Sequence, residues 1–223
     1  MNTVSVSKAP FGMSSVLVKV AMAVSGLGMA VWLTLHMIGN SLWLGGPALM
    51  NGYGHKLHES GVLWPVRLLL VVGFGVHVVC AILTSQRARR ARTTAYQRQK
   101  RVKTWPAIAA RSIQWTGVAL FGFVIYHVLT VYDVAHPAFV AGNFHHNLGA
   151  LLARPAHALL LVGATALVAL HLGHGLASAS ITLGGVQPGR EALMRRAFRA
   201  WSVLLTVGFA LPVLGHWLSM LRP

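Results

Sequence analysis

The sequence predicts an all-α protein, an integral membrane bundle of five transmembrane helices. Hydrophobic residues make up 55% of the 223 residues and charged residues only 10%, although about a quarter of a soluble domain is charged. The apolar residues gather into five runs in a single domain, residues 1–223, and each run has the ~20 residues that cross a hydrocarbon core. The runs lack the alternation of a barrel strand. Helix is therefore the form that satisfies their backbone hydrogen bonds within the membrane.

The first span is expected at residues 14–42, after a short polar arm of residues 1–13 at the inner surface. Its apolar run begins after Lys19 and continues without charge to His55, which exceeds the roughly 7–15 apolar residues of a cleaved signal peptide. We therefore expect a retained span. The segment 43–60 is rich in glycine, asparagine and histidine, which predicts a loop, with a short surface helix as an option.

The other four spans are separated by polar or basic segments. We expect the second span at 61–86, and the basic segment RARRARTTAYQRQKRVK separates it from the third span at 106–134. Three histidines and no acid mark the next loop, which precedes the uncharged fourth span at 155–180. A short loop with four arginines then leads to the fifth span at 200–221.

Basic residues predict the orientation, because the cytoplasmic loops of membrane proteins are enriched in lysine and arginine. With the N-terminus inside, 15 of the 19 basic residues lie on the inner side and 4 on the outer side. We therefore expect a cytoplasmic N-terminus, an outer C-terminus and a multi-pass protein of the bacterial inner membrane. The formal charge of +16 is then explained by the basic residues that flank the spans on the inner side of a lipid bilayer. We expect no nucleic-acid partner.

Cysteine usage narrows the possible cofactors. Cys80 is the single cysteine of the chain, which excludes an internal disulfide, a cysteine-ligated zinc site and a C-x-x-C-H haem attachment. The chain also lacks the cysteine set of an iron–sulfur cluster and a flavin-binding fingerprint. We expect Cys80 to be a small buried apolar residue.

Two histidines lie in the outer half of the membrane. An imidazole in hydrocarbon requires a partner. His36 lies 17 residues beyond Lys19, and His127 lies 16 residues beyond Arg111. Both spans rise from the inner face, so both histidines lie roughly 25 Å from the inner end at a rise of 1.5 Å per residue.

Two further histidines lie in the inner half. His77 lies 16 residues beyond Gly61, and His171 lies 17 residues beyond Arg154. Their spans descend from the outer face, so both histidines lie roughly 25 Å below the outer end. The sequence therefore predicts two levels of paired histidines, separated by something on the order of 10 Å or more.

Two levels of two imidazoles on different helices are what two bis-histidine haems require. Iron in a porphyrin has two axial positions on opposite faces, and neutral imidazole is a suitable ligand for iron. We therefore expect two non-covalent haems b, one held by His36 and His127 and one by His77 and His171. The separation from His36 to His77 is 41 residues and that from His127 to His171 is 44, which indicates a repeated pair of spans.

Other readings of these residues stay open. A membrane histidine can instead join helices by a hydrogen bond or relay protons. His174 competes with His171 as a ligand, although its depth does not match that of His77, and His216 has no partner in depth, so we expect it to pack or lie at the interface. We expect most histidines in or beside the outer loops to be solvated: His55, His58, His136, His145, His146 and His157.

Small and aromatic residues in the spans have two interpretations. Gly73 and Gly175 lie four residues from His77 and His171, on the same helix faces. Such positions permit close approach of a porphyrin, but they equally serve ordinary helix packing. The seven tryptophans fall mostly near span ends, as in an interfacial belt.

At these histidines the sequence resembles the dihaem cytochrome b membrane anchor of succinate dehydrogenases and fumarate reductases (respiratory complex II), in its five-helix, single-polypeptide form. The ordered set of similar stretches covers most of residues 30–185: HMIGNSLWLGG, NGYGHKLHES, WPVRLLLVVGFGVHVVCAILTSQRARRARTTAY, TGVALFGFVIYHVLTVYDV and HLGHGLASASITLGG. In that family the ligands pair across the first and third helices and across the second and fourth. The resemblance thus implies the same two pairs.

The resemblance implies partners that the residues alone do not show. Such anchors bind an iron–sulfur subunit and a flavoprotein subunit at the cytoplasmic face, and the FAD and the iron–sulfur clusters belong to those subunits. Dicarboxylate chemistry is theirs too, and this chain contributes electron transfer between them and a membrane quinone, usually menaquinone. The stretch AGNFHHNLGALLARP departs from the family pattern, because it lacks the aromatic and acidic residues expected there. Lys56, His58 and Glu59 lie near the outer level and are our candidates for handling a quinone proton.

Two other functions compete with this one. The first is the cytochrome b subunit of another quinone-linked enzyme, of the hydrogenase or formate dehydrogenase type. The second is a haem-free polytopic transporter or assembly protein whose histidines relay protons.

Overall fold

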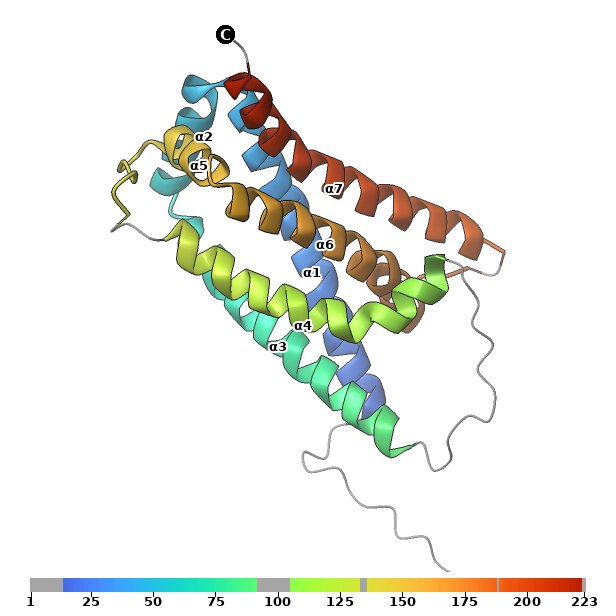
Figure 1. The fold of residues 1–223 in the computed structure, drawn as a ribbon. Helices are drawn as coiled ribbons and strands as arrows, with labels where there is room; N and C mark the ends of the chain where they lie inside the picture. The colour runs from blue at the N-terminus through green and yellow to red at the C-terminus, as the bar shows by residue number, and fades with distance from the viewer. Residues whose placement is uncertain (1–13, 92–104, 133–135, 188, 222–223) are drawn as a thin grey trace, which may run out of the picture.

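The chain folds into helices, and five of them are long and apolar enough to cross a membrane. The computed structural model describes residues 14–91, 105–132, 136–187 and 189–221, and in this part of the chain there is no strand. The predicted all-α bundle of five spans is therefore confirmed (Figure 1). The helices are α1 Ser15–Ser41, η1 Leu42–Gly45, α2 Pro47–Glu59, α3 Leu63–Arg90, α4 Trp105–Val131, α5 Phe144–Leu152, α6 Pro155–Thr182 and α7 Glu191–Met220.

The first four long helices end within a few residues of the predicted spans, but the last one does not. Helix α7 begins at Glu191, nine residues before the predicted start at 200, so the expected arginine-rich loop is wrong. Arginine is a good helix former, and an acidic residue in the first turn favours a helix N-terminus. The predicted arm 1–13 and most of the basic segment after α3 lie outside the described residues.

Two short α-helices, α2 and α5, lie at the end of the bundle where the C-terminus lies (Figure 1). The segment 43–60 contains η1 and α2, so the optional surface helix is present, and Gly46 between them has φ 88°, a conformation that favours glycine. The segment 135–154 contains α5, so the expectation that it is a loop throughout is wrong. The side chain of Asn143 accepts a hydrogen bond from the His146 backbone N–H at 3.1 Å and so caps α5.

The two short helices pack together into a polar cap. Asn51 is at its centre, because its Nδ2 donates to Asn143 Oδ1 at 3.1 Å and its Oδ1 accepts from the His145 backbone N–H at 2.9 Å. Trp43 stacks on the His145 ring at 4.9 Å and donates from Nε1 to the His145 carbonyl at 3.1 Å. Trp217 donates to the Leu152 carbonyl at 3.1 Å. Two of the tryptophans expected in an interfacial belt thus hold this cap together.

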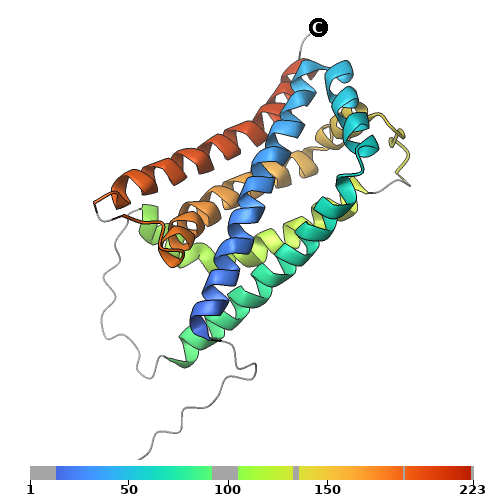
Figure 2. The same ribbon diagram turned by 180° about the vertical axis from the view of Figure 1, so that it is seen from behind.

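Four of the long helices, α1, α3, α4 and α6, form a four-cornered bundle. In this bundle α1 lies opposite α4, and α3 lies opposite α6. Helix α1 packs closely on α3 and α6, and α4 packs on α6. Helices α3 and α4 lie side by side in both views (Figures 1 and 2) and meet through side chains, as when Phe74 stacks on Phe121 at 5.7 Å. A side chain that points inward from one corner therefore meets the helix at the opposite corner.

Helix α7 packs along α1 and α6 and closes one side of this arrangement. Met37 of α1 lies against Gly208, which has no side chain to block the sulfur. Trp201 donates from Nε1 to Thr34 Oγ1 at 3.0 Å, and Thr206 Oγ1 donates to the Thr165 carbonyl at 3.3 Å. Small residues and interhelical hydrogen bonds of this kind join helices in membranes.

The first six α-helices form two similar units, each a long helix, a short helix and a second long helix. One unit is α1, α2 and α3, and the other is α4, α5 and α6. The repeat predicted from the histidine separations thus extends to the short helices.

Candidate functional site

The outer pair of histidines comes from opposite corners of the bundle. The rings of His36 on α1 and His127 on α4 lie 6.0 Å apart, with their planes at 77°. Aromatic rings surround the pair: Trp32 stacks on His36 at 5.9 Å, and Phe123 stacks on His127 at 5.6 Å. The structure therefore brings together two residues that lie 91 positions apart in the sequence.

The nitrogen atoms of the outer pair are incompletely satisfied. Asn40 Nδ2 donates to His36 Nε2 at 3.2 Å, so Nε2 of His36 carries no proton. The same Nδ2 also donates to the backbone carbonyl of His36 at 2.9 Å. His127 Nδ1 is buried and has no hydrogen-bond partner among the described residues. A buried polar atom without a partner is costly, which marks this position for a further ligand or an ordered water.

The inner pair repeats the same arrangement on the other two corners. The rings of His77 on α3 and His171 on α6 lie 6.3 Å apart, with their planes at 63°. Each ring lies over a glycine of the neighbouring helix. A Cβ on Gly26 of α1 would lie 3.1 Å from His77 Cε1, and one on Gly117 of α4 would lie 3.5 Å from His171 Cε1.

Hydrogen bonds define which nitrogen of the inner pair is free. His77 Nδ1 lies 3.2 Å from the Met22 carbonyl, which can only accept, so Nδ1 carries the proton and Nε2 is bare. His171 Nδ1 lies 3.2 Å from Thr116 Oγ1. A bare Nε2 together with a hydrogen-bonded Nδ1–H is the form in which histidine ligates a metal.

The contacts of the inner pair also show the height between the two levels. On α1, His77 lies beside Gly26, and His36 follows ten residues later in the same helix. On α4, His171 lies beside Gly117, and His127 again follows ten residues later. At 1.5 Å per residue both counts place the two pairs about 15 Å apart along the bundle.

The separation of the facing rings fits an axially ligated iron. An imidazole nitrogen binds a first-row metal at about 2 Å, and its ring centre lies a little over 1 Å further away, so two axial rings have centres about 6 Å apart. Both pairs have that spacing. No group of three or more metal-ligating side chains occurs among the described residues, and a porphyrin, which supplies four equatorial nitrogens itself, needs only two protein ligands. The residues present therefore fit haem.

The competing histidines occupy other surroundings. His174 is half-buried on α6, and within the described residues no ring contact joins it to His77. His216 packs its ring on Trp43 at 5.6 Å, and its buried Nε2 has no hydrogen-bond partner in the described part of the chain. Neither ring stacks on or faces a ring of the two pairs in the described residues, although His174 lies one turn from His171 on α6.

The expectation that His157 is solvated is wrong. Its side chain is only 3% exposed, and Tyr126 Oη lies 2.9 Å from its Nδ1. Tyr126 directly precedes His127 on α4, so this hydrogen bond joins α6 to the helix that carries His127. The one sequence signal that could have indicated a buried His157 is the tyrosine next to His127.

The predicted quinone residues lie in the last turn of α2. Lys56, His58 and Glu59 are all exposed. His58 Nδ1 lies 2.8 Å from the Gly54 carbonyl, and the His58 ring packs on Phe144 of α5 at 5.0 Å. These contacts hold His58 against the cap, while the side chains of Lys56 and Glu59 are exposed beside it.

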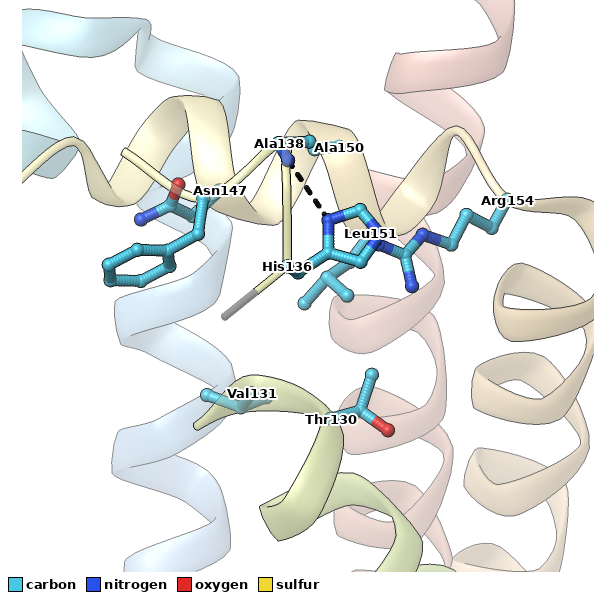
Figure 3. Close-up of a pocket in the computed structure, with 9 residues that line it drawn as sticks. Thr130, Val131, His136, Ala138, Asn147, Ala150, Leu151 and Arg154 are labelled. Atoms are coloured by element: carbon cyan, nitrogen blue, oxygen red, sulfur yellow. Dashed lines mark hydrogen bonds between the residues drawn. The ribbon is translucent and has the colours of Figure 1, made fainter. Parts of the chain in front are cut away.

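A separate small pocket lies at the same end of the bundle, between the end of α4 and α5 (Figure 3). His136 is its central side chain. Its Nδ1 accepts from the Ala138 backbone N–H at 3.1 Å, and its Nε2 contacts the guanidinium of Arg154. Thr130 lies across the pocket from them (Figure 3). None of the predicted quinone residues lines this pocket.

Comparisons with known proteins neither add to this site nor change it. No protein-family model, no curated protein and no solved structure matches the chain.

Proposed function

We propose that the chain is a membrane cytochrome b that holds two haems between its paired histidines and carries electrons between an extrinsic partner and a membrane quinone. The observation that supports it is the geometry of the pairs: imidazoles on opposite corners face each other at 6.0 and 6.3 Å. Haem, when bound, supplies one-electron redox chemistry at a potential that its axial ligands and surroundings set. The four histidines would hold it, and the hydrogen bonds of His77 and His171 to Met22 and Thr116 would orient two of these ligands.

The chain's own residues would act as follows. His77 would present a bare Nε2, because its Nδ1–H bonds to the Met22 carbonyl, and Nδ1 of His171 lies beside the hydroxyl of Thr116. His36 would release Asn40 from Nε2, and Asn40 would keep its bond to the backbone carbonyl of His36. With the two levels about 15 Å apart, an electron path across the membrane would have one centre in each half.

The distribution of basic residues supports one orientation of the bundle across the membrane. In the described residues, arginines cluster at the end of α3 and the start of α7, the end opposite the polar cap. By the positive-inside rule this end faces the cytoplasm. The N-terminus is then inside and the C-terminus outside, in a bacterial inner membrane. The basic end would dock the partner or bind anionic lipid.

Among membrane cytochromes b, the sequence resemblance favours the anchor of succinate dehydrogenase or fumarate reductase. The partner would then be an iron–sulfur subunit that carries a flavoprotein subunit, and the quinone would be menaquinone. Glu59, with Lys56 and His58, would handle the quinone proton at the outer face. The hydrogenase and formate dehydrogenase types share the histidine chemistry, and a flavoprotein gene beside this one would separate them.

A haem-free proton relay receives less support. A relay needs nitrogens within hydrogen-bonding distance or a bridging water. In the described part of the chain His36, His77 and His171 bond to other groups, His127 Nδ1 has no hydrogen-bond partner, and no hydrogen bond joins the two histidines of either pair.

Single-histidine variants test the proposal. We expect His36→Ala and His127→Ala to lose the same haem and to retain the other, and His77→Ala and His171→Ala to show the converse. His174→Ala and His216→Ala are the matched controls and should retain both haems. Haem content and the absorbance spectrum of the purified, monodisperse chain are the measurements. Loss of both haems from a folded single variant, or loss of a haem from a control, would contradict the pairing.

A further inference from the structure

Thr116 of α4 contacts His171 in a way that determines the direction of their hydrogen bond. The threonine is 3% exposed. Its Oγ1 lies 3.0 Å from the Ser112 carbonyl and 3.1 Å from the Ile113 carbonyl, so the one hydroxyl hydrogen is donated to the backbone. At the contact of 3.2 Å with His171 Nδ1, the hydroxyl oxygen therefore accepts and the imidazole donates.

Ser25 of α1 contacts His77 in the same way. Its Oγ donates to the Ala21 carbonyl at 2.8 Å and lies 3.5 Å from His77 Nδ1. The Met22 carbonyl, 3.2 Å from the same nitrogen, is the nearer acceptor. Removal of the serine hydroxyl thus leaves His77 with an acceptor, whereas Thr116 is the one hydrogen-bond partner of His171 Nδ1 in the described residues.

The two hydroxyl residues occupy equivalent positions in the two repeated units. Each is followed directly by the glycine over which the neighbouring imidazole lies, Gly26 after Ser25 and Gly117 after Thr116. Each also precedes an outer histidine of its own helix by 11 residues. A serine or threonine that bonds back to its own helix is common. The recurrence of such a residue, with a glycine and an imidazole contact, in both units is what singles out this pair.

We infer that Ser25 and Thr116 are positioning residues, which hold the inner imidazoles with Nε2 bare and turned toward each other. The inference rests on the proposed function, because it gives that nitrogen an iron to bind. A hydrogen bond from Nδ1–H makes imidazole a more basic ligand. A more basic ligand stabilises ferric over ferrous iron, so these hydroxyls lower the reduction potential of the inner haem.

The test is a redox titration of the full-length chain with its haems bound, followed by absorbance. Thr116→Val has nearly the same shape and removes the acceptor, so we expect it to raise the midpoint of the inner haem and leave that of the outer haem unchanged. The inner haem is the one that His171→Ala loses. Thr116→Ser should restore the midpoint. Ser25→Ala should shift it in the same direction by less.

Matched controls remove hydroxyls that bond only to their own helix. Thr130→Val on α4 deletes a bond to the Tyr126 carbonyl, and Ser202→Ala on α7 deletes a bond to the Phe198 carbonyl. Neither should move a midpoint.

The outcomes separate this inference from the proposed function. A wild-type chain that binds no haem overturns both. A wild type with two haems, in which Thr116→Val and Ser25→Ala leave the inner midpoint in place, overturns the inference alone. Equal shifts of both haems, or failure of Thr116→Ser to restore the midpoint, also overturn it. If Thr116→Val does not fold, Ser25→Ala against Ser202→Ala decides.

Discussion

Gly26→Ala should disturb the inner site through a single added methyl group. The new Cβ would lie 3.1 Å from His77 Cε1 and 3.3 Å from Nδ1, whereas ordinary van der Waals contact begins at 3.4 Å. The ring must therefore move by about 0.3 Å, away from a helix that also supplies its hydrogen-bond acceptor, the Met22 carbonyl at 3.2 Å. Overpacking of this kind costs about 1 kcal/mol at the lower end of its range. Haem held by His77 should then bind about fivefold more weakly.

Gly28→Ala is the matched control, because a Cβ there meets nothing within 4 Å. Both variants lie in α1 and gain the same helix propensity, about 1 kcal/mol, so the difference between them isolates the contact with His77. Gly117→Ala, with its Cβ at 3.5 Å from His171 Cε1, should behave like Gly28→Ala. The assay is the rate and extent of haem transfer to an excess of a competing haem-binding protein. Equal transfer from Gly26→Ala and Gly28→Ala would refute the reasoning.

Two further predictions concern the outer end of the bundle. Gly54→Ala should lower the thermal unfolding midpoint in detergent, because its Cβ would lie 2.5 Å from Cε2 and 2.8 Å from Cγ of Phe144, an overpacking that costs about 1–3 kcal/mol. Gly52→Ala in the same helix meets open space and should raise the midpoint by its helix propensity alone; a fall in both would count against the contact. Tyr126→Phe should reduce the free energy of unfolding by about 1–2 kcal/mol, because it leaves buried His157 Nδ1 without its partner at 2.9 Å, and an unchanged denaturation curve would contradict this.

The bundle and its histidine levels were predictable because they depend on simple geometry. Apolar length specifies a span, and a constant rise per residue converts sequence distance into depth. His36 and His127, 91 positions apart, therefore emerge at one level without any knowledge of packing. Depth alone does not show that two side chains face each other, and the structure adds that part.

Other features depended on contacts that no periodic pattern reports. Helix α5 is only nine residues long, and its main sequence signal is the capping residue Asn143, which the surrounding glycines and histidines obscure. The predicted start of α7 is nine residues too late, because a cluster of arginines suggests a loop, whereas arginine also favours helix when the chain continues into a span. Ser25 precedes His36, and Thr116 precedes His127, by the same 11 residues. The significance of this spacing is recognised only once the contacts of the two hydroxyls are known.

The most direct test of the account is the haem content and low-temperature electron paramagnetic resonance spectrum of the purified wild-type chain. We predict two non-covalent haems b per chain, both low-spin in the ferric state and both unreactive toward carbon monoxide when reduced, because in the proposed pairing imidazole would take both axial positions of each iron. A chain purified intact without haem would contradict the account. So would a single haem, or a high-spin signal from an iron with an open axial position.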